Sequence, residues 1–214
     1  KLNRRLAIRL GAKIMAETSA TQDAVGGAAT ASVAFSKLGA QPSLMSWLGD
    51  DGVGRLSVEY LRTHGVDMSG VTSQKRTRTN HHYVLRRGAE RTIIASNEQF
   101  DYGWREPVCR PDWVYLSMIS GESWHLHEAL GRYLAKHGSV KLAFQPGPAH
   151  IAWGKEKLPS LLKRTHVIIM NIDEAMALTG RTARTTKPLL TELHELGPEI
   201  VVVTDGPRGA FAYD

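Results

Sequence analysis

Val25-Gly26-Gly27-Ala28-Ala29-Thr30 opens the stretch of sequence that decides the fold, which continues through Leu38-Gly39 to Leu48-Gly49-Asp50-Asp51-Gly52. Two successive glycines let the backbone pass close to a ligand, and the alanine-rich residues after them predict a helix that Leu38-Gly39 ends. The first amides of this helix have no internal partners and its dipole is positive there. The glycine turn can therefore hold hydroxyl groups or an anion.

A short apolar segment follows this helix and leads into a second one. Residues 43–48 predict a buried strand, and the Gly/Asp turn after them begins a helix over 53–64. A helix, a strand and a helix at this spacing predict an α/β layer.

Composition limits the class of protein. The chain has 214 residues with 42% hydrophobic content, enough for a real core, and its length predicts a single domain over 1–214. Cys109 is its one cysteine, which excludes an internal disulfide framework, and no apolar run approaches the ~18 residues of a membrane span. We therefore expect a cytoplasmic protein with no membrane partner.

Charge favours anionic ligands without indicating nucleic acid. Lys and Arg number 27 against 21 Asp and Glu, so the formal net charge is +6. The basic residues are scattered and lack the interleaved aromatic residues of a base-stacking surface. We expect phosphorylated small ligands. A nucleic-acid-associated protein is a weaker hypothesis, which predicts steeply salt-dependent retention on DNA.

Two segments predict a small β lid attached to the α/β layer. Residues 6–16 partly alternate apolar with polar or small side chains, which favours an exposed strand pair or ribbon. Residues 79–85 and 90–95 predict a hairpin across Gly88. The lid is thus expected at about 5–20 and 78–97. A two-stranded flap with one apolar face is unstable alone, so the lid is compatible with a homodimer.

From about residue 112 the chain alternates strands with helices. Strands are predicted at 113–117, 140–144, 166–170 and 199–204, and helices at 123–137, 155–164, 172–179 and 187–196. This alternation predicts a mostly parallel sheet with right-handed crossovers. Ligands bind such sheets at the carboxyl ends of the strands, so the turns that follow the strands are the candidate site.

In this order, the segments resemble the PfkB (ribokinase-like) family of carbohydrate and nucleoside kinases over nearly the whole chain. The glycine turn, its helix and Gly49-Asp50-Asp51-Gly52 are similar to the family's first signature. The remaining similar segments are Val66-Asp67-Met68-Ser69-Gly70-Val71, the lid hairpin Gly88-Ala89-Glu90-Arg91-Thr92, the Asn-x-x-Glu element Asn171-Ile172-Asp173-Glu174 and the nucleotide-contacting turn Val203-Thr204-Asp205-Gly206. The implied fold is a ribokinase-like, mostly parallel sheet flanked by helices, with a small β lid.

The resemblance implies ATP-dependent phosphoryl transfer to a hydroxyl of a sugar or nucleoside, with Mg²⁺. Positioning and charge neutralisation are the chief demands of that reaction. The implied acceptor-binding residues are Gly26, Gly27, Thr30 and Gln145. The implied nucleotide-binding residues are Asn171, Glu174, Thr204 and Gly206, and Glu174 would contact Mg²⁺ through water.

Several departures from the family pattern affect this expectation. The family's catalytic base is an aspartate in a Gly-Ala-Gly-Asp segment, which does not occur in residues 1–214, and the family's first strand is not found either. Thr30 and Gln145 stand where the family usually has asparagine. We therefore expect the chain of residues 1–214 to bind nucleotide or sugar weakly at best and not to catalyse turnover. An incomplete chain is the simplest explanation, and a degenerate, non-catalytic ligand-binding or regulatory paralogue is the alternative.

Structural roles also explain some of these residues. Asn171 three residues before Glu174 is a helix N-cap pattern, and Asp50 and Asp51 are typical turn formers and N-caps. His81 and His82 are adjacent on a predicted strand and point to opposite faces, so we assign no zinc site.

Overall fold

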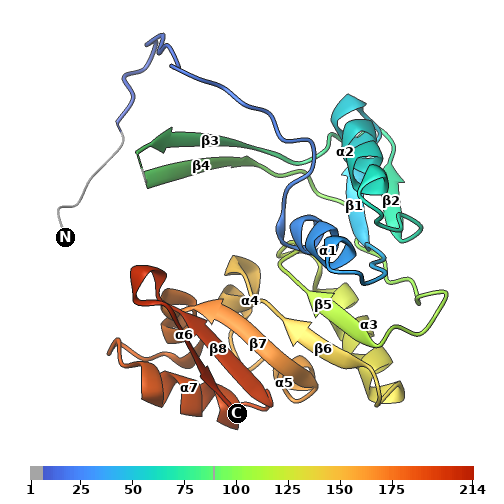
Figure 1. Cartoon of the computed structure of the whole chain (residues 1–214), viewed down its shortest axis with the longest axis vertical. Helices are drawn as coiled ribbons and strands as arrows, with labels where there is room; N and C mark the ends of the chain where they lie inside the picture. The colour runs from blue at the N-terminus through green and yellow to red at the C-terminus, as the bar shows by residue number, and fades with distance from the viewer. Residues whose placement is uncertain (1–6, 89) are drawn as a thin grey trace.

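The computed structural model describes residues 7–88 and 90–214 (Figure 1). The helices are α1 (Gly27–Lys37), α2 (Gly52–Thr63), α3 (Trp124–Lys136), α4 (Pro148–Trp153), α5 (Pro159–Leu162), α6 (Ile172–Thr179), α7 (Thr186–Glu195) and the 3-10 turn η1 (Gly206–Arg208). The strands are β1 (Ser46–Gly49), β2 (Val71–Gln74), β3 (His81–Arg87), β4 (Glu90–Ser96), β5 (Trp113–Leu116), β6 (Lys141–Phe144), β7 (Thr165–Asn171), β8 (Ile200–Thr204) and β9 (Ala210–Tyr213).

The main sheet has five strands in the order β5-β6-β7-β8-β9. The pairs from β5 to β8 are parallel, and only β9 runs antiparallel to its neighbour. Helices connect each parallel strand to the next, because a parallel pair needs a crossover connection. The expected α/β fold with a mostly parallel sheet is confirmed, and the four parallel strands β5 to β8 lie within a few residues of their predicted bounds.

A second parallel pair, β1 with β2, lies beside α2 (Figure 1). β1 was expected from its apolar residues. β2 was not, because Val71-Thr72-Ser73-Gln74 is short and mostly polar. Its backbone pairs with β1 in register from Ser46 opposite Val71 onwards.

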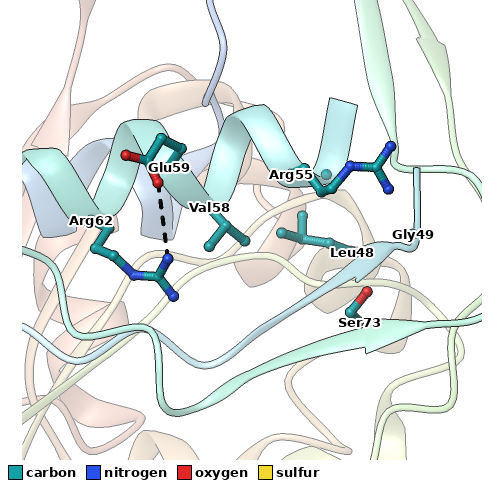
Figure 2. A pocket seen from close by; sticks show the side chains of 8 residues that line it. Leu48, Gly49, Arg55, Val58, Glu59, Arg62 and Ser73 are labelled. Carbon is teal, nitrogen blue, oxygen red and sulfur yellow. Dashed lines mark ion pairs between the residues drawn. The ribbon is translucent and has the colours of Figure 1, made fainter. Parts of the chain in front are cut away.

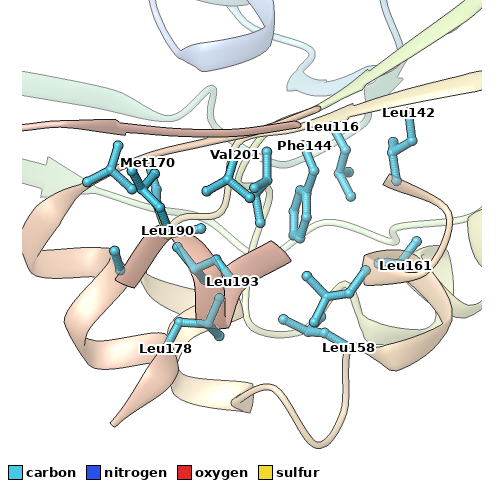
Figure 3. Packing of buried hydrophobic residues seen from close by; sticks show 14 of the residues in the cluster. Leu116, Leu142, Phe144, Leu158, Leu161, Met170, Leu178, Leu190, Leu193 and Val201 are labelled. Atoms are coloured by element: carbon cyan, nitrogen blue, oxygen red, sulfur yellow. The ribbon is translucent and has the colours of Figure 1, made fainter. Parts of the chain in front are cut away.

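The main core lies between the five-stranded sheet and its helices (Figure 3). Alternate residues of the strands point into it, and Ile168, Phe144 and Val201 are fully buried. Leu161 from α5 and Leu193 from α7 meet them from the helical side (Figure 3). This alternation is the period of a strand with one face on the core.

A smaller aromatic cluster joins β1 to α3. Trp47 on β1 packs with Phe100 and Leu126, and each is less than a tenth exposed. Tyr102 and Trp47 form a T-shaped aromatic pair, with ring centroids 5.2 Å apart. Side-chain packing therefore links the β1–β2 pair to a helix of the five-stranded sheet.

The predicted hairpin is confirmed as the antiparallel pair β3–β4, which extends away from both sheets (Figure 1). Gly88 at its turn has a φ of +60°, a conformation that glycine adopts at little cost. The strand pair expected over 6–16 is wrong. Residues 7–20 are exposed and contain no strand, and residues 5 and 6 lie outside the described part. Alternation alone cannot make a strand where no neighbouring edge accepts its backbone hydrogen bonds.

Two helices also differ from expectation. The helix predicted over 155–164 is shorter, because α5 begins at Pro159, and α4 was not predicted at all. Proline suits the first turn of a helix, where its missing N–H is not needed. Among the described residues, no helix has the length and apolar character needed to cross a bilayer.

Candidate active site

Two of the expected nucleotide-binding segments lie side by side at the end of the main sheet. Asn171 ends β7 and Thr204 ends β8, and they are direct register partners. Asn171 also caps α6, since its side-chain oxygen accepts a hydrogen bond from the Glu174 N–H at 2.9 Å. Glu174 Oε2 in turn accepts from the Asn171 N–H at 2.9 Å. The predicted N-cap is confirmed, and it holds the Glu174 carboxylate at the end of the strand.

The turn after β8 carries a group of ion pairs, here called the Asp205 cluster: Asp173, Arg184, Asp205 and Arg208. Arg208 donates to Asp205 from Nε at 2.6 Å and from Nη2 at 2.7 Å. Arg184 donates to Asp205 Oδ1 at 2.9 Å and to Asp173 Oδ1 at 2.7 Å. The hydrogen bonds from Arg208 and Arg184 hold the pKa of Asp205 well below its usual range. Gly206, with a φ of +54°, follows this carboxylate and opens the 3-10 turn.

The glycine turn before α1 lies against the end of β5. Gly26 has a φ of +118°, which strongly favours glycine. A Cβ on Gly27 would lie only 1.9 Å from Ser117 Oγ, so the helix start and the residue after β5 are in close contact. Thr30 is exposed one turn into α1, where its N–H donates to the Gly26 carbonyl at 2.9 Å.

Gln145, directly after β6, is fixed from two sides. Its backbone N–H donates to the Leu116 carbonyl at 2.8 Å, and its side-chain oxygen accepts from the Tyr115 hydroxyl. Tyr115 also contacts Phe35 of α1, with ring centroids 6.0 Å apart. Burial raises the pKa of Tyr115. The ends of β5 and β6 and helix α1 are thus held together around Gln145.

A buried histidine pair anchors the backbone that follows Gln145. His150 Nδ1 accepts from the Gly147 N–H at 3.0 Å, and His127 Nδ1 lies 2.7 Å from the Ser123 carbonyl. These partners assign one proton to His127 Nδ1 and one to His150 Nε2, which donates to His127 Nε2 at 2.8 Å. Burial and the neighbouring His127 lower the pKa of His150 to about 3.

The expected site residues therefore follow neighbouring strands along one edge of one sheet. Ser117 follows β5, Gln145 follows β6, Asn171 ends β7 and Thr204 ends β8. Gly27 reaches the same edge through its contact with Ser117. The edge offers amides, amide and hydroxyl side chains and carboxylates, a set suited to polyhydroxyl and phosphate groups.

Asp51 has a structural role, as predicted. Its Oδ1 accepts from the Gly54 N–H and from Thr79 Oγ1, at 2.8 and 2.7 Å, and its Oδ2 accepts from the Thr79 N–H at 2.9 Å. Asp51 thereby caps α2 and ties it to the base of the hairpin. Gly49 must be small, since a Cβ there would lie 2.2 Å from the Thr77 carbonyl oxygen.

A Mg²⁺ ion would find oxygen ligands at this edge. Mg²⁺ binds through one or two carboxylates and keeps several waters. Glu174 is partly exposed and uses one carboxylate oxygen for the Asn171 N–H, which leaves acceptor capacity for a bound water. Within residues 7–88 and 90–214, no three His, Cys, Asp or Glu side chains gather closely enough to hold a metal by themselves.

Two cavities lie away from this edge. One of about 330 Å³ lies between α2 and the β1–β2 pair, with Leu48 and Val58 at its base and Arg55 and Arg62 beside it (Figure 2). Another of about 540 Å³ lies along α7. Neither includes a residue expected from the sequence to bind acceptor or nucleotide.

Sequence reasoning missed the arginines of the Asp205 cluster. Asp205 was noted only as part of the nucleotide-contacting turn, and Arg184 belongs to a loop without any motif. Its partners Asp173 and Asp205 are 11 and 21 positions away in the chain. The charge of Arg184 was visible in the sequence, but its partners were not.

Comparison with known proteins identifies the family. Residues 4–214 match the model of the pfkB family carbohydrate kinases. Curated relatives include "Probable fructokinase-5" of Arabidopsis thaliana, 27% identical over 93% of this chain, and the ribokinase of Haemophilus influenzae, 25% identical over 89%. The chain spans 66% and 63% of the length of these two relatives, just under two thirds.

Solved structures agree on the fold. The Vibrio cholerae O395 fructokinase with fructose, ADP and calcium ion bound superposes with a TM-score of 0.69 and 19% identity, over 88% of this chain and 65% of that one. The Arabidopsis thaliana ribokinase complexed with ribose and ATP gives a TM-score of 0.65 and 21% identity, over 96% of this chain and 68% of that one. The match of residues 4–214 to the family model shows that the chain belongs to the pfkB family of carbohydrate kinases.

Proposed function

We propose that this chain forms the acceptor-binding and nucleotide-binding edge of a kinase that transfers a phosphoryl group from ATP to a hydroxyl of a sugar such as fructose or ribose. The observation that carries the proposal is the placement of Gly27, Gln145, Asn171 and Thr204 at one edge of one sheet. When bound, ATP would supply the phosphoryl group and Mg²⁺ would neutralise its charge.

The nucleotide would lie over the ends of β7 and β8. Asn171 and Glu174 are fixed by reciprocal hydrogen bonds. Glu174 would therefore hold a metal-bound water without a further loss of side-chain conformational entropy. Thr204 and Gly206 border the same turn and would line the nucleotide. Preorganised groups of this kind suit a reaction that depends on positioning.

The acceptor would lie at the ends of β5 and β6. Gly26 and Gly27 allow the backbone of α1 to approach a sugar, and Thr30 presents an exposed hydroxyl one turn later. Gln145 offers an amide nitrogen for a sugar hydroxyl, because its oxygen is engaged by Tyr115. Fructose and ribose are proposed as acceptors because the relatives named above are a fructokinase and a ribokinase.

Acceptor-dependent ADP release tests the proposal. We expect the protein encoded by the complete gene to release ADP from MgATP faster with fructose or ribose than without acceptor. Residues 1–214 alone should bind both ligands weakly and not turn over, because they contain no Gly-Ala-Gly-Asp base segment. Sugar binding by the complete protein without ADP release would favour the non-catalytic, regulatory alternative. The absence of both sugar and nucleotide binding would contradict the proposal.

We also propose that the β3–β4 hairpin serves as a lid and joins two copies in a homodimer. Tyr83 and Ile94 are register partners on one hairpin face and are 60% and 52% exposed. Ile94→Lys should shift the protein toward monomer in analytical ultracentrifugation. Ile93→Lys, on the opposite face and 51% exposed, is the matched control. Equal effects of both changes would contradict an interface on the Tyr83 face.

We place the protein in the cytoplasm as a prediction, supported by its single free cysteine, Cys109.

A further inference from the structure

The edge proposed to bind nucleotide carries carboxylates that would repel it. Glu174 would face the metal, but Asp173 in the first turn of α6 and Asp205 directly after β8 have no such role. The phosphates of a nucleotide are anionic, so each uncompensated carboxylate at this edge opposes binding. Nucleotide binding therefore requires that these charges be neutralised or turned away.

Arg184 bridges two of these carboxylates. It lies in the loop between α6 and α7, and its guanidinium donates to Asp173 Oδ1 through Nη1 and to Asp205 Oδ1 through Nη2. The Asp205 side chain is only 6% exposed, whereas Arg184 is 38% exposed. Arg208 contacts Asp205 but not Asp173 in the described structure, so Arg184 joins the turn after β7 to the turn after β8.

We propose that Arg184 is a positioning residue for the nucleotide: by pairing with Asp173 and Asp205 it fixes the two strand-end turns relative to each other and neutralises carboxylates beside the phosphates. This inference rests on the proposed kinase function. It adds a residue outside every motif singled out in the sequence. Without Arg184, Asp173 has no arginine partner and Asp205 keeps only Arg208.

The same loop provides a matched control. Arg181 donates from Nε to Glu192 Oε2 at 2.5 Å, and Lys155 lies 3.6 Å from the other oxygen of that carboxylate. Glu192 belongs to α7 and is not part of the strand-end turns. Arg181→Gln therefore removes the same charge and a similar ion pair from the same loop, without touching Asp173 or Asp205.

Titration calorimetry with MgATP and MgADP, at low and high salt, tests the proposal. Arg184→Gln should weaken binding by about tenfold at low salt, and less at high salt, because screening reduces charge effects. Arg181→Gln should change the dissociation constant by less than about twofold, the effect of a rim charge remote from the ligand. The dissociation constant of Arg184→Lys should lie between those of the wild type and Arg184→Gln, since an ammonium group cannot reproduce the hydrogen bonds of a guanidinium to two carboxylates. Equal losses in Arg184→Gln and Arg181→Gln would overturn the proposal.

A second measurement needs no nucleotide. Amide hydrogen exchange should be faster over 171–176 and 204–209 in Arg184→Gln than in the wild type, with the rest of the sheet unchanged. A wild-type protein without nucleotide binding would contradict the proposed kinase function. Hydrogen exchange would still test whether Arg184 holds the two turns together through Asp173 and Asp205. Unchanged exchange at both turns would overturn the role of Arg184 whether or not nucleotide binds.

Discussion

Replacing Asp51 by alanine should detach the start of α2 from the base of the hairpin. The carboxylate of Asp51 accepts three hydrogen bonds, one from Gly54 and two from Thr79. The bonds from Thr79 are the main reason that the pKa of Asp51 is lowered. At neutral pH the residue is therefore an ionised cap that also fixes the segment leading into the lid.

The expected loss of stability follows from these bonds. Removing an N-cap costs about 1 kcal/mol, and each hydrogen bond to a charged group contributes about 1.5–3 kcal/mol. Asp51 is partly exposed, so water replaces some of these interactions, and we expect Asp51→Ala to lose about 3 kcal/mol of unfolding free energy. Asp51→Asn keeps one oxygen acceptor but turns an NH₂ group toward the Thr79 N–H, and should lose about 2 kcal/mol.

Asp50 provides the matched control. Its carboxylate lies 3.7 Å from Arg55, and both side chains are more than half exposed. Asp50→Ala should therefore lower the unfolding free energy by less than about 0.5 kcal/mol. Urea unfolding followed by tryptophan fluorescence measures all three variants, with the slope of free energy against urea as the check on two-state behaviour.

The pH dependence of the same comparison adds a second test. Because the folded-state pKa of Asp51 is lowered, its contribution is fully present above its unfolded pKa of about 3.9 and is lost as the pH falls further. The gap between wild type and Asp51→Ala should therefore shrink below about pH 4. Equal losses in Asp51→Ala and Asp50→Ala, within about 0.5 kcal/mol, would refute the structural role of Asp51.

Two further predictions concern the histidine pair and the β1 turn. The lowered pKa of His150, about 3, means that the unfolded chain binds more protons below about pH 6.5, so the contribution of His150 to unfolding free energy should fall by about 2 kcal/mol between about pH 7 and about pH 5. Burial also lowers the pKa of His127, which adds to this fall. His150→Asn should flatten that dependence, and an unchanged pH slope would contradict the buried, neutral assignment. Gly49→Ala should lower the unfolding free energy by at least about 3 kcal/mol or prevent folding, because the added Cβ would meet the Thr77 backbone. A Cβ at Gly52 would meet nothing within 4 Å, so Gly52→Ala should be neutral or slightly stabilising. Similar melting temperatures for the two glycine variants would contradict the close approach at Gly49.

The sequence was most informative where residues have strong local preferences. The β-branched runs of β7 and β8 predicted strands, and alternation with helices predicted their parallel pairing. Because the carboxyl ends of parallel strands meet at one edge, the placement of Gln145, Asn171 and Thr204 was predictable. The Asn171–Glu174 cap was readable from its spacing, as was the cap formed by Asp51.

Long-range partners account for most of what the sequence did not predict. β2 is polar and short, and only its pairing with β1 makes it a strand. Residues 6–16 carry a partly alternating pattern, but residues 7–16, the described part of that segment, form no strand. Arg184 carries charge in a loop without a motif, and its partners come from two other elements. The contact of His150 with His127 depends on how α3 and α4 pack together, and those of Gln145 depend on the pairing of β5 with β6.

Amide NMR spectra of the protein encoded by the complete gene, titrated with MgATP, test the central claim most directly. We predict saturable shifts at Asn171, Glu174, Thr204 and Gly206, together at one edge of the sheet, with the Figure 2 cavity unaffected. Fructose or ribose should shift a separate group around Gly27 instead. No shift at either group, or nucleotide shifts confined to the cavity beside α2, would contradict the account.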